Sequence, residues 1–307
     1  MAVTVVDLKL KDLRYLVALA EARHFGQAAA ACFVSQPTLS AQLRKLEQYL
    51  GVQLDERQPR HVTLTEAGAA IATQARQIVA STEDIVRLAQ SWRDPLAGRL
   101  RIATLPTVGP YLLPQIMVRL RKALPHLEVM LYEYQTLPML DHLRAGDIDL
   151  GVLALPAPTE GLDSLPLYNE PFVLAVPKNH HLAARRQVQI SELRNDALQL
   201  LEEGHCLSRQ ALAVCARSRA HAKQDFRATS IETLRQMVAA GAGVTLLPAL
   251  ACRGAYSTAP GLRLLNLVKP IPTRRISAVW RQSTARAAAI SAFCELLLRN
   301  HGIGRAT

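Results

Sequence analysis

Apolar residues at helical spacing mark the first part of the chain. Four of them recur at i, i+3, i+4 and i+7 and predict a helix over about residues 11–23: Leu13, Leu16, Val17 and Ala20. The alanine-rich stretch 27–32 predicts a second, short helix. A third helix is expected after Ser35, because serine caps helix N-termini and Pro37 suits a first helical turn.

The third helix is amphipathic. Its apolar positions share one face: Leu39, Leu43, Leu46 and Leu50. The cap and the opposite face carry residue types that reach phosphates and base edges in the major groove of DNA. The candidate DNA contacts are Ser35, Gln36, Pro37, Thr38, Ser40, Gln42, Arg44 and Lys45. An ordinary solvated helix face is the alternative for such a polar stripe.

A basic turn follows the third helix. Gly51 ends the helix, and the polar stretch 52–64 contains Arg57 and Arg60, which we take as further DNA contacts. Two short helices, a tight turn, a capped polar helix and a basic hairpin form the order of a winged helix-turn-helix.

The stretch 65–93 predicts one long helix, which ends before Asp94-Pro95. Ile71, Ile78 and Ile85 recur every seven residues along it. Such a seam packs against a second copy of the same helix or against its own chain, and periodicity alone does not separate the two.

Beyond Pro95 the pattern changes to strands that alternate with helices. Strands are predicted over residues 100–105, 127–133, 148–155, 171–176, 197–201, 243–247 and 275–280. Helices are predicted over residues 111–123, 138–145, 190–193, 231–240 and 285–299. This alternation predicts an α/β fold with a parallel sheet. The strand 197–201 delivers His205 and Cys206 just past its carboxyl end, where open α/β sheets bind ligands.

Composition narrows the class of protein. At 307 residues, half of them apolar, the chain is long enough for about two domains with a sizeable core. A net charge of +11 favours nucleic acid as a partner, although anionic membranes or acidic proteins would suit it too. No apolar run reaches membrane-spanning length, and no secretory signal is apparent. We therefore expect a cytoplasmic protein whose five cysteines are reduced by default.

The stretch 201–215 places Cys206 beside His205 and a second thiol at Cys215. A continuous helix would hold the two Cα atoms about 13 Å apart, whereas a disulfide needs them within about 7 Å. Joining the thiols would therefore require this segment to unwind. A cation such as a charged His205 favours the reactive thiolate, and a second thiol can condense with a sulfenic acid. Two buried core cysteines are the alternative.

The other cysteines lie in apolar or helical surroundings, which favours core packing for Cys32, Cys252 and Cys294. A metal site built on Cys206, Cys215 and His205 would need another ligand at zinc-type spacing, and none is found nearby. We expect neither a metal nor a cofactor.

Two motifs carry a family resemblance: Phe25-Gly-Gln-Ala-Ala-Ala30 and the stretch from Val34-Ser-Gln-Pro to Lys45-Leu-Glu47. They resemble the winged helix-turn-helix of LysR-type transcriptional regulators. Later landmarks of that family are matched by Thr65-Glu-Ala-Gly68, Asp147-Ile-Asp-Leu-Gly-Val152, Leu174-Ala-Val-Pro177 and Gly243-Val-Thr-Leu-Leu-Pro248. The resemblance covers almost the whole chain.

Three further stretches resemble the peroxide-sensing activators within that family: 106–114, 204–207 with Cys215, and 226–230. The resemblance implies that Cys206 reacts with hydrogen peroxide and that Cys215 resolves the product. It also implies a peroxide pocket formed by Thr107, Thr136, His205 and Arg274, for which Arg275 is the neighbouring alternative to Arg274. Ser208-Arg209 departs from the Arg-Asp usual there.

The resemblance implies the domain organisation as well. We expect a winged helix-turn-helix domain over residues 1–64, a linker and dimerisation helix over 65–95, and a redox-sensing domain over 96–307. The last should be a two-lobed fold like that of periplasmic binding proteins, with lobe I at about 99–165 and 269–307 and lobe II at about 166–268. The implied assembly is a homotetramer that binds double-stranded DNA and RNA polymerase.

Two other functions fit parts of this pattern. A LysR-type regulator of a small organic ligand would share every domain, and the formation of a Cys206–Cys215 disulfide by peroxide would distinguish the two. A thiol peroxidase would also use Cys206 and a resolving thiol. An enzyme has no need of a basic helix-turn-helix, so we expect a regulator rather than an enzyme.

Overall fold

The structure is a computed structural model that describes residues 8–57, 62–91, 94–193, 196–216 and 221–299. The chain divides into two compact units, one formed by the first 92 residues and the other by nearly all of the rest. Each unit has a hydrophobic core of its own, so each is described separately.

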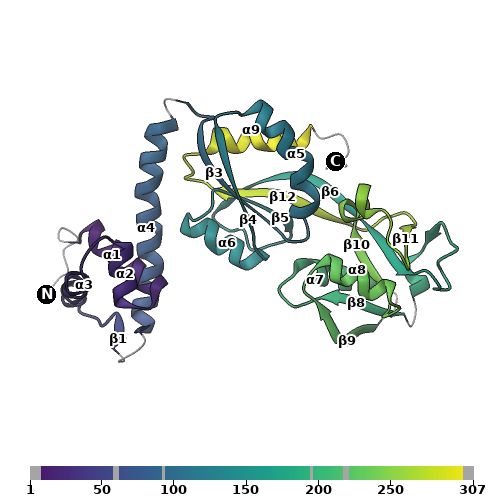
Figure 1. Cartoon of the computed structure of the whole chain (residues 1–307), viewed down its shortest axis with the longest axis horizontal. Helices are drawn as coiled ribbons and strands as arrows, with labels where there is room; N and C mark the ends of the chain where they lie inside the picture. The colour runs from purple at the N-terminus through teal and green to yellow at the C-terminus, as the bar shows by residue number, and fades with distance from the viewer. Residues whose placement is uncertain (1–7, 58–61, 92–93, 194–195, 217–220, 300–307) are drawn as a thin grey trace. The chain divides into compact units, whose positions relative to one another are not determined.

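The first unit contains three short helices, a two-stranded hairpin and a long helix (Figure 1). In chain order they are α1 (Leu10–Ala22), α2 (Phe25–Ala31), α3 (Gln36–Leu50), β1 (Asp55–Arg57), β2 (Val62–Leu64) and α4 (Glu66–Ser91). The core of this unit includes Leu16, Leu39 and Leu43, which are almost fully buried. These leucines belong to the apolar helix faces that the sequence predicted. The predicted winged helix-turn-helix order is confirmed.

The second unit alternates strands and helices, as the α/β prediction requires. Its strands are β3 (Gly98–Thr104), β4 (Leu127–Glu133), β5 (Leu150–Leu155), β6 (Leu162–Pro177), β7 (Gln187–Val188), β8 (Ala197–Leu201), β9 (His221–Ala228), β10 (Thr245–Pro248), β11 (Leu262–Leu267) and β12 (Thr273–Arg281). Its α-helices are α5 (Gly109–Ala123), α6 (Thr136–Ala145), α7 (Cys206–Cys215), α8 (Ile231–Ala239) and α9 (Ala287–Leu298). Short 3₁₀ turns form η2 (Ile190–Leu193), η3 (Ala249–Cys252) and η4 (Gly254–Tyr256).

The main sheet has the strand order β4-β3-β5-β12-β6-β11-β7, and β10 also pairs with β6. The prediction of a parallel sheet is right where β3 pairs with β4 and β5. It is wrong for β12 against β5 and β6, and for β6 against β10 and β11, all of which are antiparallel. β8 and β9 form a separate parallel pair.

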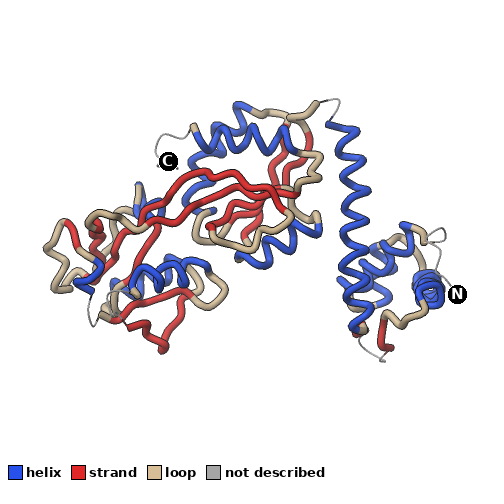
Figure 2. The backbone as a smooth tube through the Cα atoms, turned by 180° about the vertical axis from the view of Figure 1, so that it is seen from behind, coloured by secondary structure: helices blue, strands red, loops and turns tan. Residues whose placement is uncertain are grey.

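β6 links the two halves of the second unit. It is 16 residues long. Residues 162–171 pair with β12, and residues 172–177 pair with β10 and β11 (Figure 2, long red tubes). One strand thus belongs to both ladders, and the expected lobe boundary at about residue 165 falls inside it.

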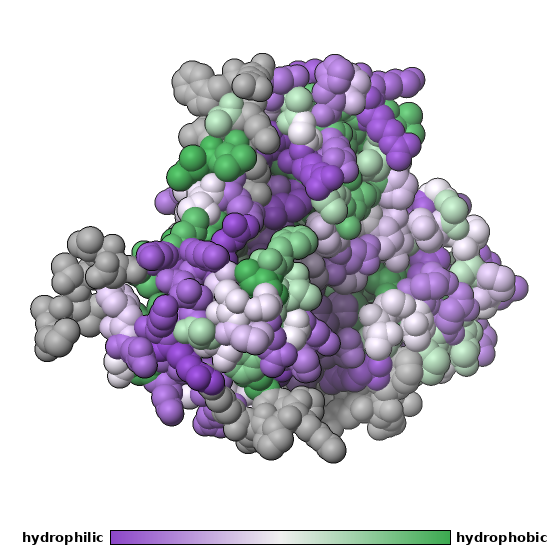
Figure 3. Space-filling model, turned by 60° about the vertical axis from the view of Figure 1, so that its left-hand side comes forward, coloured by the Kyte–Doolittle hydropathy of each residue, from purple (hydrophilic) through white to green (hydrophobic). Residues whose placement is uncertain are grey.

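On the face of the molecule drawn in Figure 3, hydrophilic residues cover much of the surface and hydrophobic residues form separate groups among them. Among the described residues, no helix combines the length and the apolar character that a membrane crossing requires.

Candidate functional site

The α3 helix begins with a side-chain cap. The Ser35 hydroxyl accepts the backbone N–H of Thr38 at 3.3 Å, and the two side-chain oxygens lie 2.7 Å apart. This cap fixes the helix entry, and Pro37 occupies its first turn. Leu39, Leu43 and Leu46 are buried, so the opposite face is open to a partner.

The predicted DNA contacts are spread along that open face. The exposed members are Ser35, Gln36, Pro37, Thr38, Arg44 and Lys45. Ser40 and Gln42 are half-buried at the edge of the face. The hairpin that should form the wing pairs Asp55 with Leu64 and Arg57 with Val62. Arg60 lies outside the described residues, and of Arg57 only the backbone is described.

Two residues of the stretch Thr65-Glu-Ala-Gly68 make specific contacts where the hairpin joins α4. The Thr65 hydroxyl donates to the carbonyl of Gln53 at 2.7 Å and accepts the Gly68 backbone N–H at 2.9 Å. A Cβ at Gly68 would collide with the backbone carbonyl of Leu54, so a side chain there is excluded. This close contact anchors the start of α4 on the first unit.

The apolar seam of α4 changes character along the helix. Ile71 is partly buried against the core of the first unit. Further on, Ile78 and Ile85 are 46% and 67% exposed, and Val86 is exposed beside them. Isoleucines repeated at seven-residue spacing and left in solvent are typical of a helix that packs against a second copy.

Both candidate thiols belong to α7, at its two ends. Cys206 is the first residue of the helix and Cys215 the last, and both are buried. Ten helical residues hold their Cα atoms about 13.5 Å apart, beyond the reach of a disulfide. A continuous helix between the thiols is not among the helices predicted from the sequence, where it entered only as a condition; the structure forms it, and both residues are thiols.

The surroundings of the two thiols differ. Cys206 lies at the N-terminus of α7, where the unpaired backbone N–H groups of a helix favour negative charge. Burial raises the pKa of Cys215 to about 11, so this thiol stays protonated near neutral pH while the helix is intact. Of the two thiols, Cys206 alone lies at the helix N-terminus.

His205 precedes the helix and is buried. Burial lowers the pKa of its imidazole, and the Glu202 carboxylate, whose Oε1 lies 3.7 Å from Nε2, partly opposes that effect. The sequence suggested a charged His205 as the cation beside Cys206. The lowered pKa instead favours a neutral ring, which can accept a proton from a neighbouring thiol.

Arg274 and Thr107 are in direct contact. The guanidinium donates to the Thr107 hydroxyl at 3.0 Å and to its backbone carbonyl at 2.9 Å. Both residues are buried, whereas Arg275 is exposed. Of the two adjacent arginines, Arg274 is therefore the one that points into the protein.

Glu170 holds Arg274 from the other side and was missed by the sequence analysis. Its Oε2 accepts from Nε of Arg274 at 2.9 Å and lies 2.8 Å from Nη2. Its Oε1 accepts the backbone N–H of Leu250 at 2.9 Å. Glu170 and Arg274 are cross-strand partners on β6 and β12, a register that the sequence does not reveal.

A second contact joins the loop before Cys206 to α6. Gly204 has φ +99°, and a Cβ there would collide with the side-chain oxygen of Gln135. Gln135 directly precedes Thr136, the first residue of α6. The Thr136 hydroxyl oxygen is buried without a hydrogen-bond partner among the described residues.

The predicted pocket residues thus form two groups in the structure. Thr107 and Arg274 are hydrogen-bonded together, and Thr136 follows Gln135, whose side chain lies against Gly204 in the loop before His205 and Cys206. Thr107 and Thr136 follow the carboxyl ends of the parallel strands β3 and β4, where ligands bind in such sheets. Within the described chain, no hydrogen bond joins Cys206 to either threonine.

The remaining cysteines pack in or against the cores. Burial raises the pKa of Cys252 and of Cys294 to about 12 each, and it also raises that of Cys32. Raised thiol pKa values make these residues poor nucleophiles.

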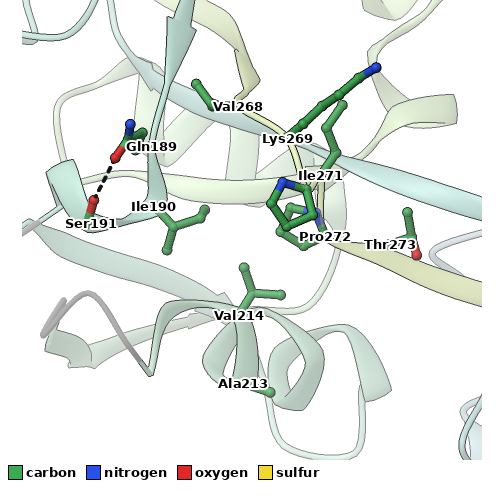
Figure 4. A pocket seen from close by; sticks show the side chains of 11 residues that line it. Gln189, Ile190, Ser191, Ala213, Val214, Val268, Lys269, Ile271, Pro272 and Thr273 are labelled. Carbon is green, nitrogen blue, oxygen red and sulfur yellow. Dashed lines mark hydrogen bonds between the residues drawn. The ribbon is translucent and has the colours of Figure 1, made fainter.

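A pocket of about 860 Å³ lies against the far end of α7 (Figure 4). Ile190 and Val214 point into it, and Lys269, Ile271 and Pro272 from the β11–β12 connection border it. Val214 precedes Cys215, so this pocket adjoins Cys215 and not the predicted peroxide site.

Two family models match the chain. Residues 10–69 match the bacterial regulatory helix-turn-helix protein of the lysR family, and residues 93–302 match the LysR substrate binding domain. Together with the arrangement of α2 and α3 and the strand–helix alternation of the second unit, these matches mean that the chain belongs to the LysR family.

Several relatives within that family are close in sequence and structure. A "hydrogen peroxide-inducible genes activator" of Dickeya chrysanthemi is 46% identical over 274 residues, which are 89% of this chain and 90% of the relative. The "DNA-binding transcriptional dual regulator OxyR" of Escherichia coli is 45% identical over the same shares. A full-length OxyR variant of Pseudomonas aeruginosa has a TM-score of 0.77 at 34% identity, covering 95% of this chain and 98% of that one. A peroxide-bound OxyR mutant of Corynebacterium glutamicum has a TM-score of 0.66 at 36% identity, covering 96% of this chain and 92% of that one.

Proposed function

We propose that this chain is a DNA-binding transcriptional activator that senses hydrogen peroxide through Cys206 and Cys215. The names of the relatives support the peroxide response. The observation that carries the proposal is the placement of the two thiols at opposite ends of one helix, since a disulfide between them forces a structural change.

The chemistry takes two steps. The Cys206 thiolate attacks one peroxide oxygen, so an S–O bond forms, the O–O bond breaks, and the departing hydroxide takes a proton to become water. Cys215, once deprotonated, then attacks the sulfenic sulfur. The S–S bond forms as the S–O bond breaks, and a second water is released. Two thiols are oxidised and one peroxide is reduced.

Thr107, Thr136, His205 and Arg274 are the residues we assign to the peroxide pocket. The two hydroxyls would orient the peroxide, and a neutral His205 would accept the thiol proton. Arg274 acts through Thr107, because its own charge is paired with Glu170. Glu170 therefore joins this set as a residue that positions Arg274.

The second step requires α7 to open. Buried Cys215 is protonated and about 13.5 Å away from Cys206, so it reacts only after the helix unwinds. Opening α7 disturbs the contacts that the helix makes with β8 and η2, which carries the signal into the rest of the second unit.

Oxidation then changes how the subunits associate on DNA. We assign the DNA contacts to the polar face of α3 and to the wing, with Arg57 and Arg60 among them, and self-association to Ile71, Ile78 and Ile85 on α4. The domains at 1–64, 65–95 and 96–307, the homotetramer and the contact with RNA polymerase belong to the same proposal. Because its target is the promoter, we expect the protein in the cytoplasm.

Peptide mapping of thiols before and after peroxide treatment tests this function. We expect a Cys206–Cys215 disulfide after treatment, none in the Cys206→Ser variant, and persistent sulfenic acid in the Cys215→Ser variant. The Cys32→Ser variant is the matched control and should respond as the unmodified chain does. A response that survives the loss of Cys206 contradicts the proposal.

The pocket of Figure 4 favours one second candidate, a LysR-family regulator of a small organic ligand. Its lining of apolar side chains with Gln189, Ser191 and Lys269 at the rim would suit an amphipathic molecule. If peroxide left all five thiols unmodified while a ligand at this pocket changed operator binding, this candidate would replace the peroxide sensor.

A further inference from the structure

Two adjacent histidines and an aspartate lie together in the second unit. His180 and His181 follow the end of β6, and Asp196 directly precedes β8. One ligand atom from each of the three residues lies within 4.8 Å of the other two. Among the described residues, this is the group of three His, Cys, Asp or Glu side chains that comes close enough to share a metal ion.

The ring of His180 is held in a defined orientation. Its Nδ1 accepts the backbone N–H of Leu182 at 3.3 Å, so in the neutral ring the proton resides on Nε2. Nε2 in turn lies 3.1 Å from Oδ1 of Asp196. Both side chains are largely buried, at 13% and 15% exposure. The hydrogen bond thus holds His180 and Asp196 side by side. A metal ion that binds Nε2 displaces its proton to Nδ1, and the 3.3 Å hydrogen bond from Leu182 is then lost.

Asp196 retains unused ligand capacity. Its Oδ2 is buried and has no hydrogen-bond partner among the described residues. A buried carboxylate oxygen without a partner is costly, and a cation at this position would satisfy it. His181 supplies the third group, because its exposed ring lies with its centroid 4.3 Å from that of His180.

We propose that His180, His181 and Asp196 form a binding site for a divalent transition-metal ion. Two imidazoles and one carboxylate match the preferences of zinc, nickel or cobalt rather than those of magnesium or calcium. Ligand atoms at about 2.0–2.2 Å from a tetrahedral ion lie about 3.4 Å apart, close to the 3.1 Å between Nε2 and Oδ1. The solvent-exposed His181 needs only a side-chain rotation to complete the set, and water fills the open position.

The site connects two segments that are far apart in sequence. A metal held there would clamp the turn after β6 to the start of β8, the strand whose far end leads to His205 and Cys206. The sequence analysis expected no metal, because it weighed only Cys206, Cys215 and His205 as ligands. The inference does not depend on the peroxide chemistry.

Cobalt(II) titration of the reduced, full-length, tag-free protein tests the proposal. We expect one ion bound per chain, with visible d–d absorption and without the charge-transfer band that a thiolate ligand would add. His181→Ala and Asp196→Asn should each weaken binding at least about tenfold, because even residues that only support metal ligands cost that much. His126→Ala, at an exposed histidine elsewhere in the same unit, is the matched control and should bind as the unmodified chain does.

Three results would overturn the site: no cobalt binding, a thiolate charge-transfer band, or unchanged affinity in His181→Ala. The band would show that one of the five thiols binds the ion instead. His181 is exposed, so its replacement leaves the fold intact even if Asp196→Asn does not, and a thermal melt of each variant checks this. Zinc should raise the melting temperature of the unmodified chain by more than that of His181→Ala, since the unmodified chain binds it more tightly.

Discussion

Arg274 and Glu170 face each other on neighbouring strands and form a buried ion pair, with Nη2 and Oε2 2.8 Å apart. The same guanidinium donates to the hydroxyl and the carbonyl of Thr107. The positive charge of Arg274 is thus already matched within the protein, and its hydrogen bonds hold a threonine of the proposed pocket in place. In the proposed pocket we therefore assign Arg274 to positioning Thr107 rather than to supplying a cation for the thiolate.

The first prediction separates stability from positioning at this pair. Glu170→Gln leaves a buried guanidinium without its counter-charge and should destabilise the protein by about 3–5 kcal/mol in urea unfolding. The double variant Arg274→Met, Glu170→Met should recover most of that stability, yet it should still react slowly with peroxide because Thr107 loses its donor. Arg275→Ala, at the exposed neighbour, is the control. If the double variant reacted normally with peroxide, the assignment of Arg274 to the pocket would be wrong.

The second prediction concerns the DNA-binding face. Arg44→Ala and Lys45→Ala should weaken binding to all sequences alike, and each lost phosphate contact should reduce the salt slope by about 0.9. Gln36→Ala should instead cost about 1–3 kcal/mol at specific operator positions, since it is assigned to a base edge. Titrations at several salt concentrations measure both effects, with Lys122→Ala in the second unit as control. An unchanged salt slope in the Arg44 and Lys45 variants would exclude these phosphate contacts.

The third prediction concerns the seam of α4. Ile78 is 46% exposed in a single chain, so Ile78→Glu should leave the chain folded but place a charge inside the interface between two α4 helices. Light scattering should show a lower oligomer and operator binding should weaken. Gln77→Glu introduces the same charge at the adjacent exposed position and should change neither. A normal assembly of the Ile78 variant would locate the interface elsewhere.

Much of this fold was predictable from the sequence because the relevant patterns are local. The bounds of β4 and β8 agree with the predicted strands. The α3 helix starts at its predicted cap because Ser35 satisfies a backbone N–H that would otherwise be unpaired.

What the sequence did not reveal depends on pairing between distant segments. β7, β9, β11 and the first half of β6 were missed, since short strands with mixed polarity carry little local signal. Glu170 was missed for the same reason: a carboxylate in a strand becomes informative only once β12 places Arg274 opposite it. The lowered pKa of His205 was likewise missed, because it results from burial in the folded protein.

The fourth prediction is a pH dependence. Burial raises the pKa of Cys215 from 9.0 to about 11, so an opened helix loses this proton at a lower pH than the closed one does. The stabilisation of closed α7 is complete below about pH 9 and declines as pH rises toward 11, by at most about 2.7 kcal/mol. The melting temperature of the reduced protein should therefore fall more steeply between about pH 8 and pH 10 than that of the Cys215→Ala variant. Cys252 and Cys294 titrate in the same direction in both proteins. If the melting temperatures of the two proteins fell equally with pH, Cys215 would not contribute to the pH dependence of stability.

The central claim is that peroxide joins Cys206 to Cys215 and thereby unwinds α7. Hydrogen exchange of reduced and peroxide-treated protein, with the disulfide mapped in the same samples, tests it most directly. We predict that backbone amides over residues 204–216 lose protection on oxidation, and that Cys206→Ser shows no change. Unchanged protection of this segment despite a mapped Cys206–Cys215 disulfide would contradict the account.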